Sequence, residues 1–123
     1  AGKRPLSSMS PTIVYDQSGK PVIALGSAGG KRIIMHVAKT IIGRLDFGLP
    51  LADAIALPNL YFTENEIMIE KSRVPALFVE QLAMLGKPVI DLDFPSKVNG
   101  AELTAKGWVG AADPRSEGTA RAE

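Results

Sequence analysis

Two short stretches of the sequence carry residue types that can hold negative charge, and the first is a glycine loop. Gly29 and Gly30 close the run Gly-Ser-Ala-Gly-Gly at residues 26–30, between an apolar strand-like stretch and a helical pattern. Glycines at such a junction can adopt positive φ angles and present unhindered backbone N–H groups beside the positive end of a helix dipole. The loop is therefore suited to a permanent anion or to the negative charge of a transition state. From the residues alone, a tight structural turn is an equally good interpretation.

The glycine loop does not match the known nucleotide-binding patterns. A P-loop places a glycine six residues before its lysine and a hydroxyl directly after it, but around Lys31 these positions hold Leu25 and Arg32. The glycine spacing also differs from the Gly-x-Gly-x-x-Gly fingerprint of dinucleotide-binding folds. What remains is the general property of two backbone donors at the start of a helix.

The second stretch is a pair of adjacent serines, Ser7 and Ser8, just before a predicted strand at 12–15. Two neighbouring hydroxyls can donate hydrogen bonds to a carboxylate from two sides. Their polar, proline-bounded surroundings at 1–11 are typical of a loop. Without other information, a plain loop or turn is the simpler interpretation.

Other candidate groups in the sequence favour structural roles. His36, the single histidine, falls on the polar side of the predicted helix with no second ligand beside it, so we expect a solvated side chain with no metal or base role. Asp91 and Asp93 alternate along a predicted strand, where edge charges are a simpler explanation than a cation site. Asp113 and Arg115 predict a turn with a local ion pair on the surface. The sequence thus predicts neither a metal nor a cofactor.

Hydrophobic spacing predicts the elements that must position the two stretches. Residues 22–25 are apolar at every position, as in a strand covered on both faces, and a turn at 16–19 joins them to the strand at 12–15. After the glycine loop, apolar residues recur with a period near 3.6, which predicts a core helix. They are Ile33, Ile34, Val37, Ala38, Ile41, Ile42 and Leu45.

The rest of the chain predicts a series of short elements. A short helix after Pro50 stops at Pro58, and a further helix begins at Pro75. The element order indicates an α+β fold in which helices pack on an antiparallel sheet. The apolar stripe of the later helix is Leu77, Phe78, Leu82 and Leu85, and the remaining predicted strands are 60–63, 66–71, 89–92, 102–106 and 108–112.

Composition and charge limit the class of protein. With 123 residues, 46% of them hydrophobic, we expect a single domain over 1–123 with a loop at 1–11 and a polar tail at 113–123. The 14 basic and 13 acidic residues leave a net charge of +1, which argues against nucleic-acid binding. The absence of cysteine excludes disulfides, thiolate zinc sites and a cysteine nucleophile. No apolar run is long enough to predict a membrane span.

Four segments in the same order resemble the carboxyl-terminal part of the small subunit of gamma-glutamyltranspeptidases. They are PLSSMSPTIV, GKPVIALGSAGGKRII, LPLADAIALP and GAADPRSEG, spread from Pro5 to Gly118. The resemblance implies an N-terminal-nucleophile hydrolase with an αββα sandwich, of which this chain is a part. It also implies a precursor that cleaves itself, and a new N-terminal threonine that attacks gamma-glutamyl amides such as glutathione by acyl transfer through a glutamyl-enzyme intermediate.

The resemblance assigns roles to both stretches. Ser7 and Ser8 correspond to the serine pair that holds the α-carboxylate of the glutamyl donor, and Gly29 and Gly30 to the oxyanion hole. Ala28 stands where the family usually has proline, a change that leaves both glycine donors in place. The implied partners are the large subunit and the remainder of the small subunit, with no cofactor, and the implied location is periplasmic or extracellular.

We expect this chain alone to be inactive and to associate with itself. The threonine nucleophile and the residues that bind the donor's amino group are expected upstream of Ala1, and Ala1 itself has no nucleophilic side chain. Open strand edges and an incompletely covered helix stripe would then favour a two-fold dimer. The alternative functions are a non-catalytic module that binds a carboxylate or another anion, and an oligomerisation module.

Overall fold

The chain forms two compact units in a computed structural model that describes residues 2–4, 7–93 and 96–121. The larger unit contains residues 1–57 and 95–123, and the smaller unit contains residues 58–94. Each unit has its own sheet and its own hydrophobic cluster. The expectation of a single domain over 1–123 stays a prediction.

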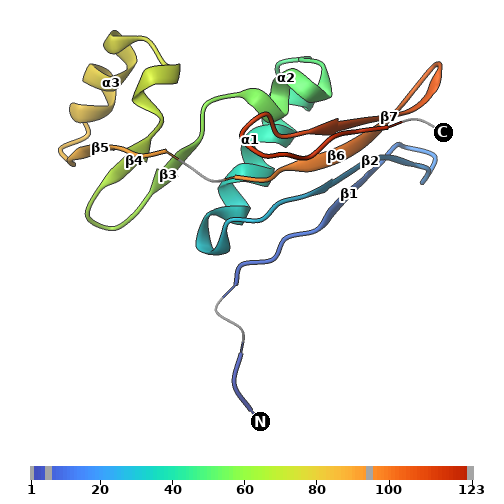
Figure 1. Cartoon of the computed structure of the whole chain (residues 1–123), viewed down its shortest axis with the longest axis horizontal. Coiled ribbons are helices and arrows are strands. Elements are labelled where there is room, and N and C mark those ends of the chain that lie inside the picture. The colour runs from blue at the N-terminus through green and yellow to red at the C-terminus, as the bar shows by residue number, and fades with distance from the viewer. Residues whose placement is uncertain (1, 5–6, 94–95, 122–123) are drawn as a thin grey trace. The chain divides into compact units, whose positions relative to one another are not determined.

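The larger unit is built on a four-stranded antiparallel sheet with the order β1-β2-β6-β7 (Figure 1). β1 (Thr12–Tyr15) and β2 (Pro21–Gly26) form the predicted hairpin. β6 (Asn99–Thr104) pairs with β2, and β7 (Gly107–Ala112) pairs with β6. The chain leaves this sheet after β2 and returns to it at β6, so the glycine loop lies at the point of departure.

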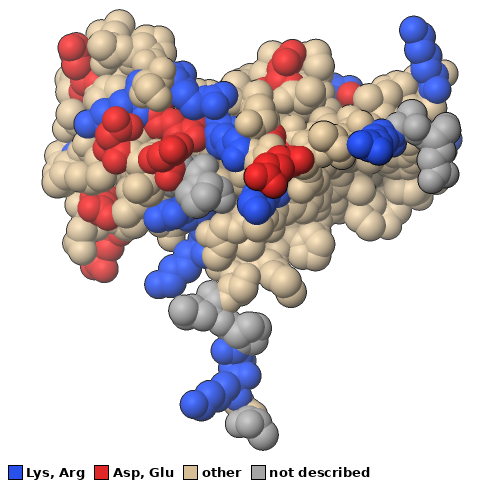
Figure 2. All heavy atoms as spheres, viewed as in Figure 1, with Lys and Arg blue, Asp and Glu red and all other residues tan. Residues whose placement is uncertain are grey.

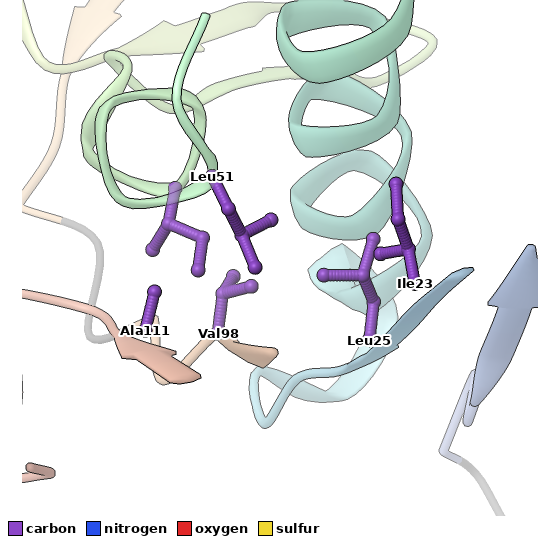
Figure 3. Packing of buried hydrophobic residues seen from close by; sticks show 6 residues of the cluster. Ile23, Leu25, Leu51, Val98 and Ala111 are labelled. Carbon is purple, nitrogen blue, oxygen red and sulfur yellow. The ribbon is translucent and has the colours of Figure 1, made fainter. Parts of the chain in front are cut away.

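Two helices cover one face of this sheet. A 3₁₀ turn (Gly30–Arg32) leads into α1 (Ile33–Leu45), and α2 (Leu51–Ala56) follows. The helices approach closely at Gly43, where a Cβ atom would lie 2.7 Å from Leu57 Cδ1 and 3.1 Å from Ala54 Cβ. Apolar side chains from β2, α2 and the strands beside them meet beneath the helices (Figure 3). The buried members of this cluster are Ile23, Leu25, Leu51, Ile55, Val98 and Ala111.

The opposite face of the sheet is apolar and exposed. The strand register aligns Ile13, Ala24, Ala101 and Gly110 in one row across all four strands. Ile13 is 55% exposed, and Trp108, two residues before Gly110 on β7, is 52% exposed. The surface over β1 and β2 is mostly uncharged (Figure 2). This face, which we call the open sheet face, therefore has the composition of a surface that another layer covers.

The predicted helix at 33–45 is confirmed, but its buried side matches the predicted stripe only in part, at Ile33 and Val37. Ile34 (53% exposed), Ile42 (44%) and Leu45 (51%) lie on the surface. The inward side is shifted around the helix, because Gly43 packs against α2 and His36 packs against the glycine loop. The buried residues are Ile33, His36, Val37, Thr40 and Gly43.

The smaller unit has a three-stranded sheet with the order β3-β4-β5. β3 (Leu60–Phe62) and β4 (Ile67–Ile69) are antiparallel, whereas β5 (Val89–Asp91) is parallel to β4, a pairing that the sequence did not indicate. A 3₁₀ turn (Lys71–Arg73) precedes α3 (Ala76–Ala83), which begins one residue later than predicted. Of its predicted apolar stripe only Leu82 is buried, against Ile67 and Ile69. The α+β class is confirmed, and no helix in the described ranges is long and apolar enough to cross a membrane.

Candidate functional site

The glycine loop joins the end of β2 to the start of α1 and adopts the conformation that its sequence predicts. Gly29 has φ 142° and Gly30 has φ 60°, both in the range that residues with a side chain rarely adopt. Residues 27–29 connect β2 to the 3₁₀ turn, which starts at Gly30. The two glycines are therefore required by the backbone itself.

The loop offers backbone donors at the start of a 13-residue helix. Within the described ranges, neither the Gly29 N–H nor the Gly30 N–H donates a hydrogen bond to another residue. Gly30 is exposed and Gly29 is partly buried, so both groups lie near the surface. The carbonyl of Gly29 accepts a hydrogen bond from the Arg32 N–H at 3.2 Å, which ties the loop to the helix. The arrangement leaves two positioned donors beside the positive end of the α1 dipole.

The chain segment that precedes β1 and contains the serine pair reaches the sheet at the end where β2 leads into the glycine loop (Figure 1). Thr12, the first residue of β1, pairs with Leu25 near the end of β2, so the chain before β1 continues toward the loop that follows β2. Ser7 is exposed and Ser8 is partly buried. The Ser8 carbonyl accepts a hydrogen bond from Ser10 Oγ at 3.0 Å.

A shallow, largely open cavity of about 720 Å³ lies at this end of the sheet. Its walls are residues 11–13 at the start of β1, residues 24–28 at the end of β2 and in the glycine loop, and residues 97 and 99–101 at the start of β6. Lys97 is the one charged residue among them, and its sign suits an anionic ligand. Among the described residues, no group of three or more histidine or acidic side chains could hold a metal ion.

Comparison with known proteins decides the family. The family model for gamma-glutamyltranspeptidase matches residues 1–123. The chain belongs to the gamma-glutamyltranspeptidase family. It is similar to the glutathione hydrolase proenzyme of Escherichia coli (strain K12), with 36% identity over 117 residues that cover 93% of this chain and 20% of that protein.

Solved gamma-glutamyltranspeptidases have the same fold. The enzyme from Pseudomonas nitroreducens in complex with L-DON superposes with a TM-score of 0.88 at 28% identity, covering 99% of this chain and 65% of that one. The Helicobacter pylori T380A mutant gives 0.83 at 35% identity, covering 94% of this chain and 65% of that one. The predicted α+β part of an N-terminal-nucleophile hydrolase sandwich is thereby confirmed. This chain spans a fifth of the E. coli relative's length.

His36 lies directly beneath the glycine loop of this gamma-glutamyltranspeptidase domain, so the prediction of a solvated histidine is wrong. The side chain is 2% exposed, and Nδ1 lies 3.3 Å from Ser27 Oγ. Burial lowers the pKa of His36 most strongly. The hydrogen bond with the Ala28 backbone opposes this shift only in part. Because the inward side of α1 differs from its apolar stripe, helical periodicity placed His36 on the wrong face.

The turn after β7 contains a buried ion pair, which corrects the prediction of a surface pair. Asp113 is fully buried; its carboxylate lies 3.1 Å from Arg115 Nη1 and accepts a hydrogen bond from Ser96 Oγ at 2.5 Å. Burial alone raises the pKa of Asp113, but the hydrogen bonds from Ser96 and Arg115 outweigh it and lower the pKa overall. The turn and the ion pair were predicted correctly, with the Ser116 N–H bound to the Asp113 carbonyl at 3.0 Å, and only the surface location of the pair was wrong.

Two cations hold the carboxyl end of α2. Arg115 Nη2 donates to the carbonyls of Ala56 at 3.3 Å and Leu57 at 2.9 Å. Lys39 Nζ on α1 donates to the Ile55 carbonyl at 2.7 Å and also to that of Leu57. Cations at a helix carboxyl end stabilise the helix dipole. These bonds join α1, α2 and the turn after β7, which fixes the helix that carries the glycine loop.

Proposed function

We propose that this chain forms part of the active site of a gamma-glutamyltransferase or hydrolase. The full protein would cleave gamma-glutamyl amides such as glutathione by acyl transfer through a glutamyl-enzyme intermediate. The observation that carries the proposal is the conformation of Gly29 and Gly30 at the start of α1, in a chain whose whole length matches the gamma-glutamyltranspeptidase family. By family resemblance, the enzyme acts in the periplasm or outside the cell.

In this proposal Gly29 and Gly30 form the oxyanion hole. Attack on the amide carbon moves negative charge onto the carbonyl oxygen, and the two N–H groups would donate hydrogen bonds to it. The positive φ angles set the direction of these N–H groups, which have no hydrogen-bond acceptor among the described residues. The positive end of the α1 dipole further stabilises negative charge at this position. Such donors stabilise the transition state more than the substrate, and losing one lowers kcat by about 10²–10³-fold.

Ser7 and Ser8 would hold the α-carboxylate of the glutamyl group. Their hydroxyls are available donors at the end of the sheet that carries the glycine loop and the cavity. Charge-assisted hydrogen bonds to a carboxylate are stronger than those between neutral groups. The glutamyl group would then be fixed by its α-carboxylate at one end and its reacting carbonyl at the other, which supplies the orientation that acyl transfer requires.

The nucleophile would come from a part of the enzyme that these 123 residues do not include. A threonine that becomes N-terminal when the precursor cleaves itself would attack, and neighbouring residues would bind the donor's amino group. The large subunit and the rest of the small subunit would therefore be obligatory partners. This chain would contribute the carboxylate grip and the oxyanion donors.

Hydrolysis of a chromogenic gamma-glutamyl anilide tests the proposal. The natural full-length protein and the 123-residue chain are assayed in parallel. Release by the full-length protein and not by the chain supports the proposal in full. Release by neither favours the anion-binding module instead, and release by the chain alone contradicts an external nucleophile.

The open sheet face supports self-association of the isolated chain as a second proposal. Ile13 and Trp108 are each more than half exposed on the open sheet face. Two copies that pack these faces in a two-fold dimer would bury them. Light scattering after size exclusion should give the mass of a dimer, whereas a monomer across the accessible concentration range would contradict the proposal.

A further inference from the structure

His36 is in direct contact with the backbone of the glycine loop. A Cβ atom built on Gly29 would lie 2.8 Å from His36 Cε1 and 3.0 Å from His36 Nδ1, so the imidazole fills the space that any other residue's side chain would take. The ring is 2% exposed and belongs to the inward side of α1. The position of Gly29 is therefore set by the edge of this ring.

The hydrogen bonds around the ring indicate its tautomer. Ser27 Oγ donates its single proton to the Ala28 carbonyl at 2.8 Å. In that arrangement the same oxygen accepts at its 3.3 Å contact with His36 Nδ1, which fits the tautomer with the proton on Nδ1. His36 thus acts as a donor to Ser27, two residues before Gly29.

We infer that His36 is a positioning residue, whose Nδ1–H holds Ser27 and whose ring packs against Gly29, and that it thereby aims the Gly29 and Gly30 N–H groups at the developing oxyanion. The inference rests on the proposed function, because it needs a reaction that generates an oxyanion. It assigns His36 no contact with substrate. Its role is to reduce the freedom of a loop that glycine makes flexible, which is how surrounding residues pre-organise catalytic donors.

The charges that face His36 favour its neutral form. Lys39 on α1 and Arg115 in the turn after β7 disfavour a further positive charge. Among the described residues the carboxylate that acts on the ring is that of Asp113, and it is already paired with Arg115. Burial acts in the same direction and lowers the pKa. The ring therefore stays neutral to a lower pH than the histidine of an unfolded chain.

The test compares His36→Asn with His36→Gln in the natural full-length protein. The side-chain amide nitrogen of asparagine can take the place of Nδ1, whereas that of glutamine extends beyond it. We expect His36→Asn to keep kcat for a gamma-glutamyl anilide within about threefold of the wild-type value. His36→Gln and His36→Leu should lower kcat by at least about tenfold, which is less than the loss of about 10²–10³-fold in kcat when a whole oxyanion donor is removed. KM should change less than twofold in all three, because the carboxylate grip is untouched.

Helix propensity makes this comparison decisive. Glutamine is the better helix former, so a purely structural role of His36 on α1 predicts that Gln outperforms Asn in both stability and activity. A kcat for Gln equal to or above that for Asn would overturn the inference, as would unchanged kcat in all three variants. Wild-type protein without gamma-glutamyl anilide activity would instead refute the proposed function.

Ser27→Ala provides a second variant that leaves the helix intact. It removes the oxygen that accepts from Nδ1, so we expect it to lower kcat by several-fold with KM unchanged. Combined with His36→Leu it should add little further loss, because both changes remove the same interaction. Additive losses in the double variant would show that the two residues act separately and would contradict the inference. All rates are calculated per molecule of folded enzyme that has completed self-cleavage.

Discussion

Alanine at Gly29 and alanine at Gly30 should have very different effects, although the residues are neighbours in the same loop. Gly30 has φ 60°, and a Cβ atom there meets nothing within 4 Å. The cost of Gly30→Ala is then the left-handed backbone alone, about 1–2 kcal/mol. Gly29 has φ 142°, and its Cβ would lie 2.8 Å from His36. An alanine at position 29 would therefore have to adopt a backbone conformation that essentially requires glycine, and its Cβ would overlap with the buried His36 ring.

The two costs of Gly29→Ala can be estimated separately. The sparsely populated φ contributes about 1–3 kcal/mol, and overpacking against the His36 ring contributes about 1–3 kcal/mol more. The loop can escape the overlap only by moving, and movement misaligns both N–H groups. We therefore expect kcat of Gly29→Ala to fall by about 10²-fold or more, as for a lost oxyanion donor, while Gly30→Ala falls clearly less.

Thermal unfolding and anilide hydrolysis of the full-length variants provide the assay, with Gly48→Ala as a control. Gly48 also has a positive φ, 68°, and open space at its Cβ, but it lies after α1 and away from the loop. It should lose stability like Gly30→Ala and keep wild-type kcat. Equal losses of stability and of kcat for Gly29→Ala and Gly30→Ala would refute the reasoning, because the ring contact would then have no energetic weight.

Three further predictions address the serine pair, the buried ion pair and pH. Ser7→Ala and Ser8→Ala should each raise KM for the gamma-glutamyl donor by about tenfold, the effect of losing a hydrogen bond to a charged group; an unchanged KM in both would remove them from the site. Arg115→Met leaves Asp113 buried without its cation and should cost about 3–5 kcal/mol of stability, measured by urea unfolding, whereas the double change Arg115→Met with Asp113→Asn should recover part of it; no recovery would contradict a charge effect. Folding lowers the pKa of His36. Neutral His36 therefore contributes its full share of the folding stability above pH 6.5, the pKa of the unfolded chain, and this share is lost as the pH falls below 6.5. Thermal unfolding of wild type and His36→Asn between pH 7.5 and 5 should therefore converge toward acid, and parallel curves would show that His36 does not titrate differently on folding.

The parts of the site that depend on backbone chemistry could be predicted from the sequence. Two adjacent glycines after an apolar strand and before a helical pattern indicated positive φ angles, and the structure has them. Strand pairing between 12–15 and 21–26 followed from the turn between them. These features are local, because each depends on residues within a few positions along the chain.

The parts that depend on packing could not be predicted in this way. The apolar residues of α1 lie on two adjoining sides of the helix. Contacts with α2 at Gly43 and with the glycine loop decide which side faces inward. That choice buries His36 and exposes Ile34. Asp113 and Arg115 looked like a surface pair because their partners, Ser96 and the α2 carbonyls, lie far away in sequence.

The contacts that sequence analysis missed form one continuous chain that ends at the candidate oxyanion hole. Arg115 joins the turn after β7 to the end of α2, and Lys39 joins the same end of α2 to α1. From α1, His36 reaches the loop at Ser27. A loop with two glycines has high conformational entropy of its own, and donors aimed by such a loop help catalysis only if its freedom is removed before the transition state forms. Since each link in this chain is buried or partly buried, it can hold the loop without help from substrate.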